Sequence, residues 1–181
     1  MAIVEPLPST SEGRRQLAIR SPATRQPVGE IVVSSPADVA EAIDKARDAQ
    51  RDWRRVPVAE RARIVRGAVD VLVDKREQVA KTIIDETGKT HLESLIMEIL
   101  PGCDYINFWS GRAEKDLSDE KRKLHGYLRP FKKLLMHYRP LGVIGVITPW
   151  NGPFSLAINP TVQAVLAGNA VILKPSEVAP H

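Results

Sequence analysis

The stretch Val143-Ile-Gly-Val-Ile-Thr148, followed by Ala170-Val-Ile-Leu173, decides the fold. Both runs are short and apolar, which is typical of strands buried in a parallel sheet. The residues between them, 153–167, have the pattern of a helix that we expect Pro160 to break or kink. A strand, a helix and a second strand in this order predict a βαβ unit. Because a parallel sheet needs more than two strands and cover on both faces, we expect the sheet to be incomplete.

Residues 141–173 carry no charge, and the stretch is long enough for a membrane span. It contains three prolines and four side-chain amides, at Pro149, Pro153, Pro160, Asn151, Asn159, Gln163 and Asn169. Inside lipid, these amides and the backbone groups left unpaired by proline would have no partners. We therefore predict the buried core of a soluble protein that has no membrane partner.

Composition narrows the class of protein. Of the 181 residues, 43% are hydrophobic, which is enough apolar surface to exclude a disordered polymer. The 26 basic and 22 acidic residues leave a net charge of +4, which by itself does not indicate nucleic-acid binding. The single cysteine excludes an internal disulfide framework, and the N-terminal residues lack the pattern of a signal peptide. We expect a reducing, cytoplasmic location.

Residues 1–125 are predicted to be mainly helical, after a short strand at 29–33. The sequence Ser35-Pro-Ala-Asp38 is typical of a helix start, because serine caps, proline suits the first turn and aspartate faces the positive helix end. Apolar residues at helical spacing continue this helix to about Trp53.

Three more helices are expected before residue 126. One begins near Pro57 and has an apolar stripe, and the next covers 76–87 and ends at Gly88. The last covers about 91–113, and we expect an interruption at Pro101-Gly102.

The character of the sequence changes near Gly126. Over residues 126–140, apolar side chains such as Tyr127, Leu128 and Phe131 alternate with lysines and arginines, which predicts exposed strands that form an arm. Some nucleic-acid-binding proteins mix aromatic and cationic residues in this way. Exposed strands also use cations to prevent edge pairing, so we expect an arm and no nucleic-acid partner.

Several local patterns resemble functional motifs without completing them. Gly88-Lys-Thr90 imitates the end of a phosphate-binding loop, but the required earlier glycine is Ile83, so Gly88 is interpreted as a helix cap. Cys103 lies in an apolar helical context and is interpreted as a structural cysteine. Metal-ligand spacing is absent from the four histidines, His91, His125, His137 and His181, so no metal site is expected.

The candidate site follows the two apolar strands, because ligands of open α/β sheets bind at the carboxyl ends of strands. Trp150 and Asn151 follow the first strand, and an amide held there can donate to a developing oxyanion. Asn151 can equally supply a hydrogen bond within a turn. Lys174 and Glu177 follow the second strand, where an acidic residue often binds a ribose diol. They can also form a simple surface ion pair.

At this point the sequence resembles a known family. The blocks Pro140-Leu-Gly-Val-Ile-Gly-Val-Ile-Thr-Pro-Trp-Asn151 and Ala167-Gly-Asn-Ala-Val-Ile-Leu-Lys-Pro-Ser-Glu177 are similar to two motifs of the aldehyde dehydrogenase superfamily, in order and at the right separation. Weaker matches, such as Glu86-Thr-Gly-Lys89, extend over nearly all of the chain. The resemblance covers about the first third of a typical family member. It implies the N-terminal part of that α/β fold, with amphipathic helices, a β arm and the first βαβ unit of a Rossmann-like sheet.

The resemblance also implies roles for individual residues. Asn151 matches the asparagine whose amide helps to form the oxyanion hole for the thiohemiacetal. The residues that match the cofactor cleft are Ile147, Thr148, Pro149, Trp150, Lys174, Pro175, Ser176 and Glu177. Of these, Lys174 and Glu177 match the pair that holds the adenosine ribose. Glutamate there tends to favour NAD, because it would repel a 2′-phosphate, although NADP-dependent exceptions exist.

The resemblance implies a division into 1–125 (helical part of the cofactor domain), 126–140 (oligomerisation arm) and 141–181 (first βαβ unit). Gly152 departs from the family, which usually has a bulky residue there. The nucleophilic cysteine and general-base glutamate of the family lie beyond residue 181, and Cys103 aligns with neither. The complete protein would oxidise an aldehyde to a carboxylic acid, as a homo-oligomer or with a complementary C-terminal chain. The alternative is a non-catalytic module that assembles with a partner chain or a full-length relative.

Overall fold

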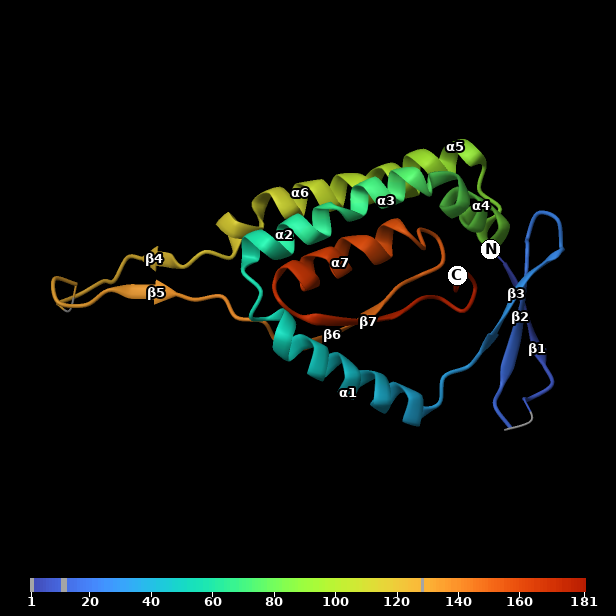
Figure 1. Cartoon of the computed structure of the whole chain (residues 1–181), viewed down its shortest axis with the longest axis horizontal. Coiled ribbons are helices and arrows are strands. Elements are labelled where there is room, and N and C mark those ends of the chain that lie inside the picture. Colours follow the sequence, from blue (N-terminus) through green and yellow to red (C-terminus); the bar gives the residue numbers. More distant parts are fainter. Residues whose placement is uncertain (1, 11–12, 128) are drawn as a thin grey trace.

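The structure is a computed structural model that describes residues 2–10, 13–127 and 129–181. A small parallel sheet lies at its centre, with one helix against each face (Figure 1). The other helices form a further layer on the outer side of one of these two helices (Figure 1). A hairpin arm projects from one end of the molecule, and a separate antiparallel sheet lies at the other (Figure 1).

The central βαβ unit consists of β6 (Val143–Ile147), α7 (Ser155–Leu166) and β7 (Ala170–Lys174). The two strands are parallel and adjacent. The turn after α7 uses Gly168 in the left-handed conformation at φ +87°, which a residue without a Cβ adopts readily. The predicted unit is therefore confirmed.

We expected Pro160 to break or kink α7, and the structure shows that it does not break the helix. Proline lacks the N–H that would bond to the carbonyl of Leu156 four residues earlier, but both residues are exposed. Water can therefore satisfy that carbonyl, and the helix continues to Leu166.

The two strands are less buried than their sequence predicts. Val146 is buried in β6, whereas Ile147 is 80% exposed and Leu173 is 44% exposed. Among the described residues this sheet has two strands, so each strand pairs on one side only. The expectation of an incomplete sheet is confirmed, while that of fully buried strands is wrong. No described helix has the length and apolarity to cross a membrane.

Helix α1 (Pro36–Trp53) covers the other face of the sheet. As predicted, Ser35 and Asp38 form a reciprocal capping box at its start. Near its end, Gln50 Nε2 donates to Gly168 O at 2.9 Å and Trp53 Nε1 donates to Val165 O at 2.8 Å. These two bonds attach α1 to the last turn of α7 and to the loop between α7 and β7.

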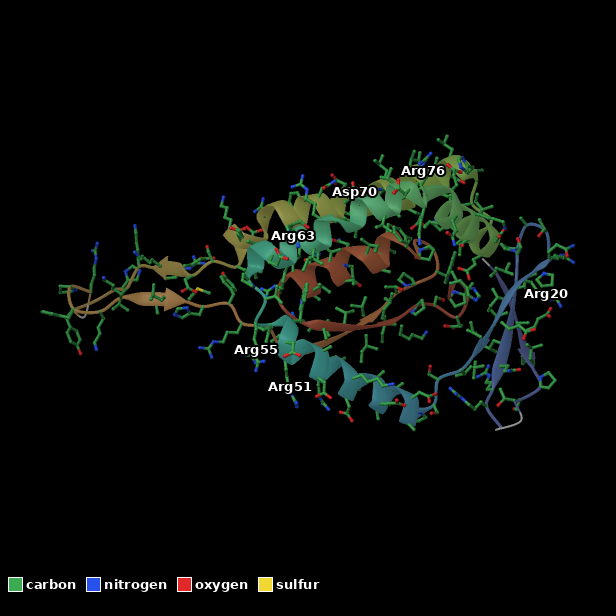
Figure 2. The ribbon with its side chains drawn as sticks, viewed as in Figure 1. Arg20, Arg51, Arg55, Arg63, Asp70 and Arg76 are labelled. Carbon is green, nitrogen blue, oxygen red and sulfur yellow. The ribbon has the colours of Figure 1, made fainter. Side chains whose placement is uncertain are left out.

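The outer helical layer is continuous in sequence from residue 58 to residue 116. Its elements are α2 (Val58–Arg66), α3 (Ala68–Asp74), α4 (Arg76–Thr87), α5 (His91–Ser94), η1 (Leu95–Ile99) and α6 (Leu100–Asp116). Apolar side chains of this layer and of α7 form the main core, with Leu72, Ile83, Ile106 and Leu166 among them. Charged side chains such as the labelled Arg63 point away from the βαβ unit (Figure 2). Gly88 ends α4 at φ +74°, as predicted.

The expected interruption at Pro101 is absent, and a π-helical turn, η1, precedes it instead. The N–H of Leu100 donates to the carbonyl of Leu95, five residues earlier. Pro101 then falls in the first turn of α6, where its missing N–H costs nothing. The irregularity therefore lies before the proline and does not break the helix.

The sequence did not predict the three-stranded antiparallel sheet of the N-terminal region. It consists of β1 (Ile3–Leu7), β2 (Gln16–Arg20) and β3 (Pro27–Val32), in that order. The strand expected at 29–33 corresponds to β3. Leu17 and Ile19 are the buried residues of the central strand.

The arm is a hairpin of β4 (Glu120–Arg122) and β5 (Leu134–Met136) that projects from the body (Figure 1). Its first strand lies before Gly126, so strands do not fill residues 126–138 as expected. Tyr127 and Phe131, near the tip, are 85% and 81% exposed. Leu128, which the sequence analysis placed in a strand, lies outside the described residues.

Candidate active site

Two loops meet at the carboxyl ends of β6 and β7. Ile147 pairs with Lys174 in the strand register, and the N–H of Thr148 donates to the carbonyl of Lys174 at 3.2 Å. The structure therefore brings the two predicted site segments, 147–151 and 174–177, to the same edge of the sheet. This is the edge at which open α/β sheets bind ligands.

Thr148 has a buried hydroxyl without a partner. The residue is buried, and among the described residues its Oγ1 has no hydrogen-bond partner. Buried polar atoms of proteins are almost always satisfied, so an orphaned hydroxyl at a ligand-binding edge indicates a missing donor or acceptor. The neighbouring Ile147, Pro149 and Trp150 are exposed.

Asn151 presents its side chain to solvent. Its carbonyl oxygen accepts a hydrogen bond from Lys89 Nζ at 2.7 Å. Its side-chain amide makes no hydrogen bond within the described part of the chain. The interpretation of Asn151 as the source of a turn hydrogen bond therefore has no support in this geometry, and the amide is available to a ligand.

Lys89 and Glu98, for which the sequence predicted no role at the site, hold this loop. Glu98 of η1 is fully buried, and its Oε2 accepts the N–H of Ser155, the first residue of α7, at 2.9 Å. Its Oε1 forms an ion pair with Lys89 Nζ. One signal was available in the sequence, since Glu98 is the single charged residue in an otherwise apolar run, Leu95-Ile-Met-Glu-Ile-Leu100.

Lys174 and Glu177 form an ion pair at 3.1 Å on the exposed edge. A hydrogen bond from the backbone N–H of Glu177, followed by the bond from Lys174, lowers the pKa of this carboxyl below its ordinary value. The carboxylate is therefore ionised at neutral pH and can accept hydrogen bonds from a diol. Between them, Ser176 is buried and its Oγ accepts the N–H of Val178 at 3.2 Å.

Gly152 is buried beside the site and leaves little room for a side chain. A Cβ built there would lie 3.1 Å from the Leu156 side chain and 3.3 Å from Ser155 Oγ. A side chain at this position would therefore require the Leu156 side chain to shift by a few tenths of an ångström.

Cys103 does not belong to this site. It lies on α6 and packs against the main core, and burial raises the pKa of its thiol. Its interpretation as a structural cysteine agrees with this environment. The described residues contain no group of three His, Cys, Asp or Glu side chains placed to hold a metal ion.

Comparison with known proteins now decides the family. The model of the aldehyde dehydrogenase family matches residues 9–181. The chain belongs to the aldehyde dehydrogenase family. It is 37% identical over 162 residues to 4,4'-diapolycopene aldehyde oxidase of a Methylomonas species, covering 90% of this chain and 31% of that protein. It is 36% identical over 160 residues to the putative succinate-semialdehyde dehydrogenase [NADP(+)] 2 of Mycobacterium bovis, covering 87% and 30%.

Solved aldehyde dehydrogenase structures have the same fold over this region. The enzyme of Mycobacterium tuberculosis, complexed with NAD+, is 31% identical and superimposes with a TM-score of 0.83, covering 96% of this chain and 35% of that one. The aldehyde dehydrogenase of Brucella melitensis biovar abortus superimposes with a TM-score of 0.85 at 25% identity, covering 95% and 34%. This aldehyde dehydrogenase chain thus spans about a third of the length of the relatives it matches.

Proposed function

We propose that this chain is the N-terminal part of an NAD(P)-dependent aldehyde dehydrogenase, in which Asn151 is the oxyanion donor. The observation that carries the proposal is the unpartnered Asn151 amide at the sheet edge where Thr148 and Lys174 meet. In this reading, the complete protein oxidises an aldehyde to a carboxylic acid. The amide stabilises the negative charge that develops on the aldehyde oxygen during nucleophilic attack.

The described residues fit a dinucleotide cofactor on three grounds. The Glu177 carboxylate and the Lys174 ammonium can bind the hydroxyls of a ribose, and the orphaned Thr148 hydroxyl offers one more polar contact. The exposed faces of Ile147 and Trp150, with Pro149 between them, offer an apolar wall. Pro175 and Ser176 set the spacing between the two charges. When bound, NAD(P)+ would supply the hydride acceptor.

Two solved relatives support this cofactor class. The M. tuberculosis enzyme is complexed with NAD+, and the glyceraldehyde-3-phosphate dehydrogenase of Bacillus halodurans is complexed with NADP. We propose NAD as the preferred cofactor here, because the ionised Glu177 would repel a 2′-phosphate. NADP is the alternative.

The chain's own residues then have separate tasks. Glu177 and Lys174 bind and orient the adenosine ribose, while the apolar wall excludes water from one side of the cleft. Asn151 donates its side-chain N–H to the aldehyde oxygen and releases it once the carbonyl forms again. The family's nucleophile and general base must come from outside residues 1–181, so we propose that this chain acts together with the remaining two thirds of the fold.

We propose that residues 1–125 and 141–181 contribute to the cofactor domain and that residues 126–140 contribute to an oligomerisation arm. The exposed Tyr127 and Phe131 give this arm the apolar surface that an interface between copies requires. A homo-oligomer or a complementary C-terminal chain is the proposed partner. A reducing cytoplasm is the proposed location, because one cysteine is present and it is partly buried.

Complementation tests the proposal. This chain is mixed with the part of the M. tuberculosis enzyme that lies outside the region matched by this chain. Aldehyde-dependent NADH formation is then measured. We call this mixture the complemented enzyme. Turnover should appear only with both parts, and Asn151→Ala should lower kcat by about 10²- to 10³-fold. Asn107→Ala, on the exposed face of α6, is the matched control and should leave kcat unchanged.

The alternative function, a non-catalytic module, makes a different prediction. The chain would then co-purify with a full-length relative through the exposed arm, without any gain in turnover. Stable association with no NADH formation under every substrate tested would favour this alternative over the enzymatic proposal.

A further inference from the structure

Glu98 has the unusual position of a fully buried charged side chain close to the proposed site. Its side chain is 0% exposed, and the side chain of its partner Lys89 is 18% exposed. An ion pair withdrawn from water is retained only where its geometry satisfies both charges. The contacts of this pair therefore call for a specific explanation.

The π turn delivers Glu98 to the loop between β6 and α7. The residue lies in η1, next to the end of that turn, and its carboxylate meets the first N–H of α7. π turns within helices are rare and occur frequently at functional sites. This one directs a carboxylate toward the segment that carries Asn151.

The pair holds both ends of that segment. Glu98 accepts the N–H of Ser155 at 2.9 Å, at the positive end of the α7 dipole. Lys89 Nζ contacts Glu98 and also donates to the carbonyl oxygen of Asn151 at 2.7 Å. Residues 151–155 are thus fixed at one end by an ammonium and at the other by a carboxylate that are themselves paired.

We propose that Lys89 and Glu98 are positioning residues that set the location of the Asn151 amide. This inference rests on the proposed oxyanion role of Asn151. An oxyanion donor must be preorganised, because a displacement of about 1 Å can cost 10²-fold in rate. Within the described residues the Asn151 side chain has no anchor of its own, so its placement depends on the backbone that Lys89 holds.

A purely structural cap for α7 is the competing explanation. In that case the Ser155–Glu98 bond alone would matter, and the contact of Lys89 with Asn151 would have no effect on turnover. The two explanations are separated by removing both charges together with Lys89→Met/Glu98→Gln. Glutamine keeps an oxygen for the Ser155 N–H, and no unpaired charge is left buried.

The test is carried out in the complemented enzyme. The double variant should keep the melting temperature of the parent and its KM for NAD+ within about twofold, while kcat falls about 10- to 100-fold. Lys89→Arg, made alone with Glu98 left in place, retains the positive charge and the hydrogen-bond donor. Its kcat should therefore be much closer to that of the parent than the kcat of the double variant. Lys81→Met/Asp85→Asn, which removes an exposed ion pair on α4, is the matched control and should not change kcat.

A background without the amide gives the decisive comparison. When the two substitutions are added to Asn151→Ala, kcat should fall by less than about twofold relative to Asn151→Ala alone. The reason is that the amide positioned by Lys89 and Glu98 is already absent. The same fold-loss in both backgrounds, or parental kcat in the double variant, would overturn the inference. If Asn151→Ala itself leaves kcat unchanged, the proposed function fails and the inference fails with it.

Discussion

The N–H of Thr148, the residue after β6, donates to the carbonyl oxygen of Lys174, the last residue of β7, at 3.2 Å. This bond completes the pairing of Ile147 with Lys174 at the edge where the candidate site lies. Because this bond joins the two loops, the segment that carries Asn151 and the segment that carries Glu177 have a fixed relative placement. A ligand that fixes the position of one loop therefore also fixes the position of the other.

The role of Glu177 can be measured through cofactor preference. Glu177→Gln removes the negative charge that we propose binds the ribose, so KM for NAD+ in the complemented enzyme should rise about tenfold, equivalent to about 1.4 kcal/mol. The change in KM for NADP+ should be smaller, because the repulsion of its 2′-phosphate is relieved. Glu114→Gln, exposed on α6, should leave both constants unchanged. An unchanged preference in Glu177→Gln would show that the Lys174–Glu177 contact is only a surface ion pair.

Two glycines should respond in opposite ways to alanine. Gly168 has φ +87°, and a Cβ there would lie 2.9 Å from Arg61 Nη1. The guanidinium cannot easily withdraw, because Arg61 Nε donates to Leu166 O and Nη1 donates to Val56 O. Gly168→Ala should therefore lower the free energy of unfolding by about 1–3 kcal/mol.

Gly111 is the matched control for this effect. It lies within α6 and has no atom within 4 Å of a built Cβ. Gly111→Ala should raise the free energy of unfolding by up to about 1 kcal/mol, because alanine is the better helix former. Denaturant unfolding of both variants measures the difference, and equal destabilisation at the two positions would contradict this account.

The start of α1 should make stability depend on pH. The backbone N–H of Ser35 and then its hydroxyl, followed by Arg14, lower the pKa of Asp38 below its ordinary value of 3.8. The stabilisation is complete above 3.8 and is lost as the pH falls through the lowered value in the folded state. Asp38→Asn should thus be less stable than the parent at neutral pH, and this difference in stability should narrow as the pH falls below 3.8.

Ser35→Ala separates the cap from the titration. This variant loses the bond from the N–H of Asp38, which persists at low pH, and also the contribution of the hydroxyl to the lowered pKa of Asp38. It should therefore lose about 1 kcal/mol of unfolding free energy at neutral pH and a smaller amount at low pH. Thermal unfolding at the two pH values provides the measurement. A gap for Asp38→Asn that widens toward low pH would have the wrong sign for this account.

Cys103 should behave as a slow thiol. Burial raises its pKa, so less thiolate is present at neutral pH and alkylation by iodoacetamide should be slower than that of a small free thiol. Unfolding in denaturant should restore the ordinary rate. Cys103→Ala should leave kcat of the complemented enzyme within about twofold of the parent, because this thiol is not the nucleophile; a loss of turnover in a folded variant would contradict that assignment.

Elements with local sequence signals were predictable. The apolar runs of β6 and β7 are short enough to be strands, and the Gly168 turn separates the second run from α7. Ser35 and Gly88 mark helix ends through side-chain capping and left-handed backbone, both of which depend on neighbouring residues only. The site loops followed from the same reasoning, because parallel strands place their carboxyl ends together.

Features that depend on distant partners were not predictable. Strand β1 contains Pro6, which a sequence pattern excludes from central strands but which an edge strand tolerates. The alternation of Leu17 and Ile19 in β2 was the available signal, and it is too short to decide a strand alone. The contact of Lys89 with Asn151 joins residues 62 positions apart, and Lys89 also pairs with Glu98 of a π turn, for which no local rule exists.

Helix α1 is attached through Gln50 and Trp53 to residues that come 118 and 112 positions later in the chain. During synthesis at about 5–20 residues per second, the ribosome therefore completes α1 roughly 6–24 s before its docking site exists. In that interval the helix has only its own cap and ion pairs to hold it. The first long helix to be translated therefore cannot dock until nearly all of these 181 residues have been made.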